Sequence, residues 1–204
     1  MADEQTIRFY DKNADEYFEK TVHVDMSAIY PRFLKYVKQG GTIIDIGSGS
    51  GRDILYFKKN GFQVSGIDAS EELCKKAIQY TKAPISCCKI EDWNPIQTYD
   101  GIWADASLVH LSIQEIDAFL KHIPERLNTD GAVYMSFKSG IITGVDRKGR
   151  FYTNVEEADI YRILDAVCGI NIEELWYSDD NLDRSDIKWM NIILRKAKAS
   201  TDYE

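Results

Sequence analysis

The sequence predicts an α/β fold built on a sheet of parallel strands, and two observations carry this prediction. Residues 42–46 are mostly β-branched and include three isoleucines, as in a buried parallel strand, and they run directly into a glycine-rich turn and then a helix. The chain has 204 residues, of which 44% are hydrophobic, so it can bury one well-packed core. We therefore expect a single α/β domain, with no room for a second full domain.

Charge and composition restrict the classes of partner. The net charge is −8, whereas a nucleic-acid substrate usually selects for a basic face, so a small molecule or a protein is favoured over nucleic acid. No run approaches the roughly 18 apolar residues of a membrane span, so we expect no membrane association and a cytoplasmic protein. The four cysteines include no C-x-x-C pair and no His/Cys pair at zinc spacing, and no metal site is expected.

Helices are predicted from apolar residues at helical spacing. Two of them precede the first strand, over residues 5–20 and, after a break, over residues 29–37. The helix after the glycine-rich turn is expected to end at the Asn60-Gly61 pair. Ser70 is a candidate N-cap for the next helix, because the two glutamates that follow it favour the positive end of the helix dipole.

The second half of the chain continues the alternation of strands and helices. A helix is expected from Ile113 to Leu127, and Thr153 or Asn154 is expected to cap the last helix. Residues 138–152 hold three glycines among charged side chains, which predicts a mobile loop. The predicted strands cover residues 42–46, 62–68, 85–90, 132–137, 170–177 and 187–194, together with a strand and its exit over residues 99–110.

The glycine-rich turn indicates a nucleotide-like ligand. Gly47, Gly49 and Gly51 permit positive φ angles and let backbone amides approach a ligand. In the dinucleotide-binding fingerprint the third glycine comes one residue later, and Arg52 stands at that position here. Asp68 ends the second strand, where a carboxylate can accept hydrogen bonds from both hydroxyls of a ribose. Nicotinamide-binding enzymes place an acid at a similar distance, so Asp68 alone does not discriminate between nucleosides.

Asp45 lies two residues before the first glycine. The resulting D-x-G-x-G-x-G arrangement resembles motif I of the class I S-adenosylmethionine (SAM) methyltransferases, in which the loop lies against the amino-acid part of the cofactor. Residues 9–17 resemble the Y-D-x-x-A-x-x-Y segment that closes over cofactor and acceptor in many small-molecule methyltransferases. Residues 99–110 resemble the Y-D-x-I-x-x-x-x-S/A-L-x-H run of the small-molecule and tellurite-resistance-type group. The resemblance covers roughly the whole chain.

The resemblance implies a fold and a domain organisation. The fold is a three-layer, Rossmann-like seven-stranded sheet with the strand order 3-2-1-4-5-7-6 and an antiparallel strand 7. The organisation is a single SAM-dependent methyltransferase domain over residues 1–204, with an N-terminal helical lid region in residues 1–40 and the Rossmann-like core in residues 41–197.

The resemblance also implies SAM as the cofactor, with S-adenosylhomocysteine as its product. Asp92, after the third strand, would lie beside the adenine amino group, with Trp93 near the ring. An acid after a strand is also a common turn residue, so both interpretations of Asp92 stay open. The implied cofactor-binding residues are Asp45, Gly47, Ser48, Gly49, Gly51, Asp68, Ala69, Asp92 and Trp93 from the core, and Tyr10 and Tyr17 from the lid region.

On the acceptor side, the resemblance points to His110 and to the loop after the fifth strand. His110 would be the catalytic residue that orients or deprotonates the acceptor, and a packed or cap-forming histidine is the alternative. Arg147, Arg150 and Tyr152 are expected to bind the substrate, because arginines can hold an anionic acceptor through bidentate contacts. A solvated run of charge is the alternative for this loop.

The predicted function is SAM-dependent methyl transfer to a small-molecule acceptor by in-line displacement. Such a reaction needs positioning, and it needs a base only where the acceptor is a hydroxyl or a carbon acid. Two alternatives remain: a nicotinamide-dependent oxidoreductase, and a non-catalytic SAM-binding protein that keeps the glycine motif and loses the acceptor side. A chalcogen anion, an amine and a hydroxylated compound are all compatible acceptors, and the oligomeric state is not fixed.

Overall fold

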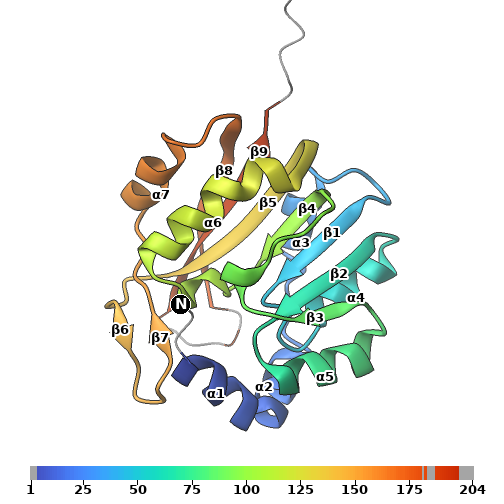
Figure 1. Cartoon of the computed structure of the whole chain (residues 1–204), viewed down its shortest axis with the longest axis vertical. Coiled ribbons are helices and arrows are strands. Elements are labelled where there is room, and N and C mark those ends of the chain that lie inside the picture. The colour runs from blue at the N-terminus through green and yellow to red at the C-terminus, as the bar shows by residue number, and fades with distance from the viewer. Residues whose placement is uncertain (1–3, 181, 183–186, 198–204) are drawn as a thin grey trace, which may run out of the picture.

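The computed structural model describes residues 4–180, 182 and 187–197, so the predicted domain ends at residues 1 and 204 lie outside it. At its centre is a seven-stranded sheet in the order β3-β2-β1-β4-β5-β9-β8 (Figure 1). Strands β1 to β5 pair in parallel, whereas β9 pairs antiparallel with both β5 and β8. Counted within the sheet, this is the predicted order 3-2-1-4-5-7-6, so the predicted fold is confirmed. The strands of the sheet are β1 (Thr42–Ile46), β2 (Gln63–Asp68), β3 (Ile85–Cys87), β4 (Tyr99–Ala104), β5 (Leu127–Ser139), β8 (Ile170–Asp179) and β9 (Lys188–Lys196).

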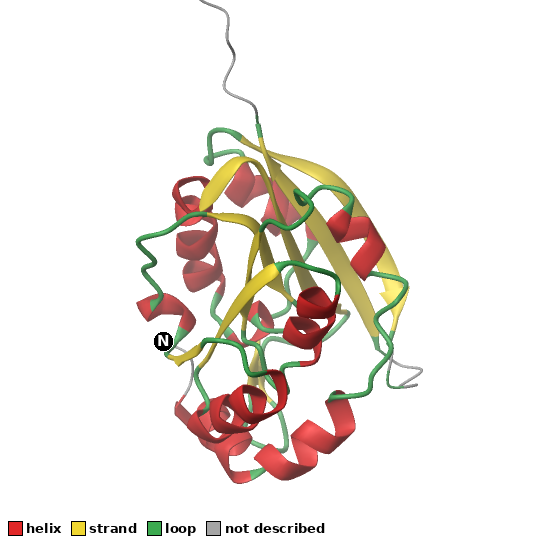
Figure 2. Ribbon diagram, turned by 90° about the vertical axis from the view of Figure 1, so that its right-hand side faces the viewer, coloured by secondary structure: helices red, strands yellow, loops and turns green. Residues whose placement is uncertain are grey.

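Helices cover both faces of the sheet and complete a three-layer arrangement (Figure 2). The helices α3 and α4 contribute to an apolar cluster on one face, and α6 and α7 contribute to a cluster on the other. The helix α5 packs beside α4, and α1 and α2 lie against α5. The helices are α1 (Glu4–Lys12), α2 (Ala14–Thr21), α3 (Tyr30–Leu34), α4 (Arg52–Lys59), α5 (Glu71–Thr81), α6 (Ile113–Arg126) and α7 (Glu157–Leu164).

The central strands are apolar on both faces because both faces are covered. Ile43 of β1 and Trp103 of β4 belong to the cluster with α3 and α4, and their neighbours Ile44 and Ile102 belong to the opposite cluster. All four side chains are at most 2% exposed. The alternation of side chains along a strand therefore fills two cores at once, as the continuous apolar run predicts.

The N-terminal region forms three helices where the sequence predicts two. The predicted helix over residues 5–20 breaks at Asn13, whose φ is −113° and ψ is 21°. The side-chain amide of Asn13 donates to the carbonyl oxygen of Phe9 at 2.7 Å, which competes with continuation of the helix. The second predicted helix is reduced to α3, which has Pro31 in its first turn.

Residues 138–152 contain a β-hairpin rather than only a loop. Strand β6 (Gly144–Val145) pairs antiparallel with β7 (Phe151–Tyr152). The Asp146 carboxylate accepts hydrogen bonds from the backbone N–H groups of Lys148 and Arg150, both at 2.9 Å, and so closes the turn. Strands of two residues carry no readable periodicity, which is why the sequence predicts a loop here.

Other predicted boundaries also differ, and β5 begins at Leu127, five residues before its predicted start at residue 132. The third strand ends at Cys87, and Ile90–Asp92 forms a single 3-10 turn. The N-cap of α7 is Glu156, in a capping box with Asp159, rather than Thr153 or Asn154. The Thr153 hydroxyl instead donates to the carbonyl oxygen of Leu111, which ties β7 to the exit of β4.

Within the described part of the chain, no helix combines the length and the apolar character that crossing a membrane requires.

Candidate functional site

The glycine-rich loop between β1 and α4 is shaped by positive φ angles. Gly47, Gly49 and Gly51 have φ values of 74°, 51° and 78°, which L side chains rarely adopt. A Cβ atom on Gly47 would lie 2.4 Å from Cβ of Ser107, and one on Gly51 would lie 2.6 Å from Cγ2 of Thr81. Gly47 therefore lets the loop approach the exit of β4, and Gly51 lets α4 pack closely on α5.

Asp68 joins this loop to the end of β2. Its Oδ2 accepts a hydrogen bond from the backbone N–H of Gly49, and its Oδ1 accepts one from Ser70, both at 2.8 Å. Burial raises the pKa of Asp68, and the backbone N–H groups of Ser70 and Gly49 oppose this rise. Each carboxylate oxygen can accept a further hydrogen bond, so Asp68 keeps acceptor capacity toward a ligand.

Two adjoining cavities lie at the carboxyl ends of the parallel strands. The first, which we call the glycine-loop cavity, has a volume of about 90 Å³ and is lined in part by Asp68, Ala69 and Ile90. The second, the central cavity, has a volume of about 150 Å³ and continues toward β5 and β9. Both are lined by Tyr10, Tyr17, Gly47, Gly49, Asp105, Ala106 and His110. These shared residues form the junction between the cavities.

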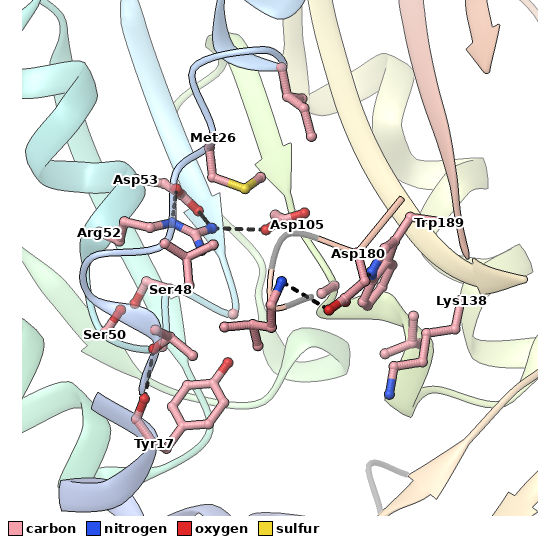
Figure 3. Close-up of a pocket in the computed structure, with 18 of the residues that line it drawn as sticks. Tyr17, Met26, Ser48, Ser50, Arg52, Asp53, Asp105, Lys138, Asp180 and Trp189 are labelled. Atoms are coloured by element: carbon pink, nitrogen blue, oxygen red, sulfur yellow. Dashed lines mark hydrogen bonds and ion pairs between the residues drawn. The ribbon is translucent and has the colours of Figure 1, made fainter. Parts of the chain in front are cut away.

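Charged side chains lie on opposite sides of the central cavity. Arg52 and Asp53 lie on one side, and Lys138, Asp180 and Trp189 lie on the other (Figure 3). The Trp189 indole N–H donates to Asp180 at 2.8 Å. The cavity is therefore polar on both sides.

Arg52 bridges two carboxylates in the wall of the central cavity. Its Nε donates to Asp53 at 2.7 Å, and its Nη2 donates to Asp105 at 2.9 Å. Burial opposes ionisation of both acids, but Arg52 and the hydroxyl and indole donors of Tyr30 and Trp103 lower the pKa of Asp53. For Asp105 burial outweighs Arg52, and its pKa is raised. The Arg52 guanidinium thus contacts two different acids: Asp53, whose pKa is lowered, and Asp105, whose pKa is raised so that it takes up a proton more readily.

His110 lies at the junction in a defined tautomer. Its Nδ1 lies 2.6 Å from the carbonyl oxygen of Phe151, which can only accept, so Nδ1 carries the proton. Nε2 therefore accepts a hydrogen bond from the Tyr10 hydroxyl at 2.8 Å. Burial, together with the charges of Arg150 and Lys138, lowers the pKa of His110 to about 4, although the Phe151 carbonyl and the Asp146 carboxylate oppose this shift. The imidazole is neutral at pH 7, and its accepting nitrogen is directed at Tyr10, which lines both cavities.

Most of the residues predicted for the site come together at these cavities. Ser48, Arg150 and Tyr152 line the central cavity, and Asp68 and Ala69 line the glycine-loop cavity. The predicted residues that line both are Tyr10, Tyr17, Gly47, Gly49 and His110.

Five predicted residues line neither cavity. Asp45 is buried in β1, and its Oδ2 has no hydrogen-bond partner among the described residues. Gly51 packs against α5. Asp92 and Arg147 are exposed, and Trp93 is buried in the core cluster beside α6.

The structure adds residues that the sequence prediction lacks. Arg52, Asp105, Lys138, Trp189 and Asn191 all line the central cavity. Asp105 and Lys138 lie at the carboxyl ends of β4 and β5, where open α/β sheets bind ligands, so position alone could have drawn attention to them. Trp189 and Asn191 lie on the antiparallel β9, and no pattern in the sequence singles them out.

The comparisons with known proteins all point to methyltransferases. Residues 18–139 match a family model described as a methyltransferase domain. A ribosomal protein L11 methyltransferase from Aquifex aeolicus (strain VF5) is 25% identical over 167 residues, which cover 79% of this chain and 55% of that protein. An uncharacterized methyltransferase from Alkaliphilus oremlandii (strain OhILAs) is 25% identical over 148 residues, which cover 65% of this chain and 66% of that protein. The chain thus spans between about half and two thirds of the length of these relatives.

Solved structures share the fold. The 1,6-didemethyltoxoflavin-N1-methyltransferase of Burkholderia thailandensis, solved with 1,6-didemethyltoxoflavin and S-adenosylhomocysteine, has a TM-score of 0.72 at 19% identity, covering 94% of this chain and 85% of that one. The CcbJ methyltransferase of Streptomyces caelestis has a TM-score of 0.72 at 13% identity, covering 95% of this chain and 99% of that one. The family model spans more than half of the chain, including the glycine-rich loop, Asp68 and the exit of β4, and on this ground the chain belongs to the methyltransferase domain family.

Proposed function

We propose that this chain transfers the methyl group of SAM to a small-molecule acceptor. The observation that carries the proposal is the junction of the two cavities. A cofactor beside Asp68 and an acceptor in the central cavity would meet at Tyr10, Tyr17 and His110, so a methyl group could pass directly between them. The toxoflavin-type methyltransferase with the same fold binds S-adenosylhomocysteine together with a small-molecule substrate, which supports this assignment.

The residues around the glycine-rich loop fit SAM. The hydroxyls of Ser48 and Ser107 are buried without a hydrogen-bond partner among the described residues, and each residue lines one of the cavities. A buried polar atom without a partner is costly, so a polar ligand at this place would stabilise the loop. Asp68 would accept from the ribose hydroxyls in addition to its two backbone donors. We propose that Gly47, Gly49 and Ala69 also bind the cofactor. Asp45, Gly51, Asp92 and Trp93 remain predictions that the cavity lining does not support.

The lid region would close the junction. Bound SAM supplies a methyl group on a positively charged sulfur, so transfer depends on alignment and on excluding water. Tyr10 and Tyr17 lie at the junction with ring centroids 5.1 Å apart. We propose that these two side chains orient both ligands and keep water from the reacting atoms.

His110 would act first as a hydrogen-bond acceptor for the methyl acceptor. Its Nε2 is unprotonated at pH 7 and at present accepts from the Tyr10 hydroxyl, which an acceptor group could replace. With a pKa of about 4 it is a weak base. Proton removal by His110 would require a nearby negative charge that raises this pKa.

Three observations count against the alternative functions. The early third glycine and the antiparallel β9 are not typical of nicotinamide-dependent oxidoreductases. A non-catalytic SAM-binding protein would have no use for the central cavity, which adjoins the glycine-loop cavity and has a volume of about 150 Å³.

Calorimetric titration with SAM, S-adenosylhomocysteine and NAD tests the cofactor. We expect micromolar binding of both sulfur nucleosides, a loss of at least about tenfold in affinity in Asp68→Ala because two ribose hydrogen bonds are removed, and no binding of NAD. Asp165→Ala, at an exposed acid after α7, is the matched control and should bind like the parent. Binding of NAD alone, or equal affinities in Asp68→Ala and the parent, would refute the proposal.

A further inference from the structure

Two cationic side chains of the central cavity lie against the same aromatic ring. The Lys138 Nζ is 4.0 Å from the ring centroid of Tyr152, and the Arg150 Cζ is 5.2 Å from it. Lys138 comes from β5, and Arg150 comes from the turn that leads into β7. Both residues line the central cavity, so two segments of the chain place positive charge at one place in its wall.

These two charges also lie close to the junction of the cavities. The His110 ring centroid is 4.6 Å from that of Tyr152, and the charges of Arg150 and Lys138 contribute to the lowered pKa of His110. The Arg150 Cζ also lies 4.9 Å from the ring centroid of Phe9, in α1. A ligand group held by the two cations would therefore lie next to His110, on the side where a methyl group would arrive.

The acidic side chains that line the central cavity have partners of their own. Asp53 and Asp105 share Arg52. Asp179 pairs with Lys188, and Asp180 accepts from the Trp189 indole.

Arg150 is held in place by an acid outside the cavity lining. Its Nε and Nη2 donate to Asp146 at 3.0 and 2.7 Å. A guanidinium has five N–H donors, so Asp146 uses only part of its capacity. Arg150 is thus pre-oriented by Asp146 and retains donors for a ligand, in a chain whose net charge of −8 would otherwise repel anions.

We propose that Lys138 and Arg150 bind an anionic group of the methyl acceptor, a carboxylate or a phosphate-type oxyanion, over the ring of Tyr152. The proposal rests on the proposed function, since it takes the central cavity as the acceptor site. It replaces the pair predicted from the sequence, Arg147 with Arg150, because Arg147 is exposed and lines neither cavity. It also allows His110 to act as a base when the anion is bound, because the anion would offset the charge of the two cations and so favour the protonated imidazole.

The test is a titration of the full chain with inorganic phosphate, with acetate, and with acetamide as the uncharged counterpart of acetate. Each is added in the presence and in the absence of S-adenosylhomocysteine. We expect at least one anion to bind with millimolar affinity and acetamide not to bind, because the site recognises charge. A preference for phosphate or for acetate tells the two oxyanion classes apart.

Three variants assign the binding to the two cations. Lys138→Gln and Arg150→Gln should each weaken anion binding about tenfold, whereas Lys138→Arg, which keeps the charge, should retain it. Lys148→Gln removes an exposed charge from the same hairpin and is the matched control. Thermal unfolding of each variant shows whether it is folded.

The outcomes separate this inference from the proposed function. S-adenosylhomocysteine binding without any anion binding, or anion binding that survives Lys138→Gln, overturns the inference and leaves the proposed function intact. Anion binding that depends on Lys138 and Arg150 in a chain that binds neither SAM nor S-adenosylhomocysteine supports the anion site and refutes the proposed function.

Discussion

At the scale of single residues, His110 is a side chain whose position could be predicted from the sequence but whose environment could not. Its place after the fourth strand could be predicted, because that strand is a long and distinctive run. Its partners could not, because the Tyr10 hydroxyl and the Phe151 carbonyl come from segments 100 and 41 residues away. The tautomer and the lowered pKa depend on those partners and on burial, so they appear only once the chain is folded.

The buried neutral His110 makes stability depend on pH. The unfolded chain binds a proton at His110 near pH 6.5, whereas the folded chain does so only near pH 4. The unfolding free energy should therefore fall as the pH drops through this window, by roughly 3 kcal/mol from this residue alone. Denaturant unfolding between pH 7.5 and pH 4 measures the slope, which His110→Gln should reduce.

The matched control for this prediction is His122→Gln, because the His122 side chain on α6 is 60% exposed. Its stability curve should keep the slope of the parent. If His110→Gln keeps the slope as well, the imidazole is not buried in neutral form, and the hydrogen-bond assignment at the junction is wrong.

Lys138 and Arg147 show the limit of residue-level prediction at the proposed acceptor site. The charged string after β5 indicates a cationic site, but a string does not say which of its residues turn inward. The hairpin directs Arg150 to the cavity and leaves Arg147 in solvent, and Lys138 reaches the same place from the strand. Composition alone predicts that the segment is cationic, whereas the turn closed by Asp146 determines which of its residues line the cavity.

At the scale of elements, the strand-loop-helix unit around β1 was predictable because local chemistry dictates it. Glycines at the turn and a β-branched run before it leave few other conformations. The N-terminal helices are different. Each of α1 and α2 buries a single residue, Thr6 and Ala14. They contact the rest of the chain through hydrogen bonds such as Tyr10 to His110 and Ser70 to Asp11, and through ring contacts such as Phe18 with Tyr80.

Helices that bury only one residue each should open more readily than the core. We expect the amides of α1 and α2 to exchange hydrogen for deuterium faster than those of α4 and α5, and to slow when S-adenosylhomocysteine fills the junction. Hydrogen exchange followed by mass spectrometry, with and without the nucleoside, measures this. Exchange in α1 and α2 that is as slow as in α4, or that does not respond to the nucleoside, would contradict a lid role for residues 1–40.

At the scale of the whole molecule, the sheet topology explains why the site exists at all. The order of the strands brings the carboxyl ends of β1, β2, β4 and β5 to one edge, so the glycine-rich loop, Asp68, Asp105 and Lys138 meet there although they are far apart in sequence. The fold class could be predicted because each strand and turn is locally consistent with it. The central cavity could not, since its wall also needs Trp189 and Asn191, which no sequence pattern singles out, and the hairpin at residues 144–152, where the sequence predicts a loop.

The most direct test of the account is to find where a labelled methyl group goes. The purified chain would be incubated with SAM carrying a trideuterated methyl group and a complete cellular extract, and the small-molecule and macromolecular fractions would be examined by mass spectrometry, with Asp68→Ala as the inactive control. We predict a labelled, anionic small molecule that is absent with Asp68→Ala. Label found only in protein, as the L11-type relative would suggest, or only in nucleic acid, would contradict the account.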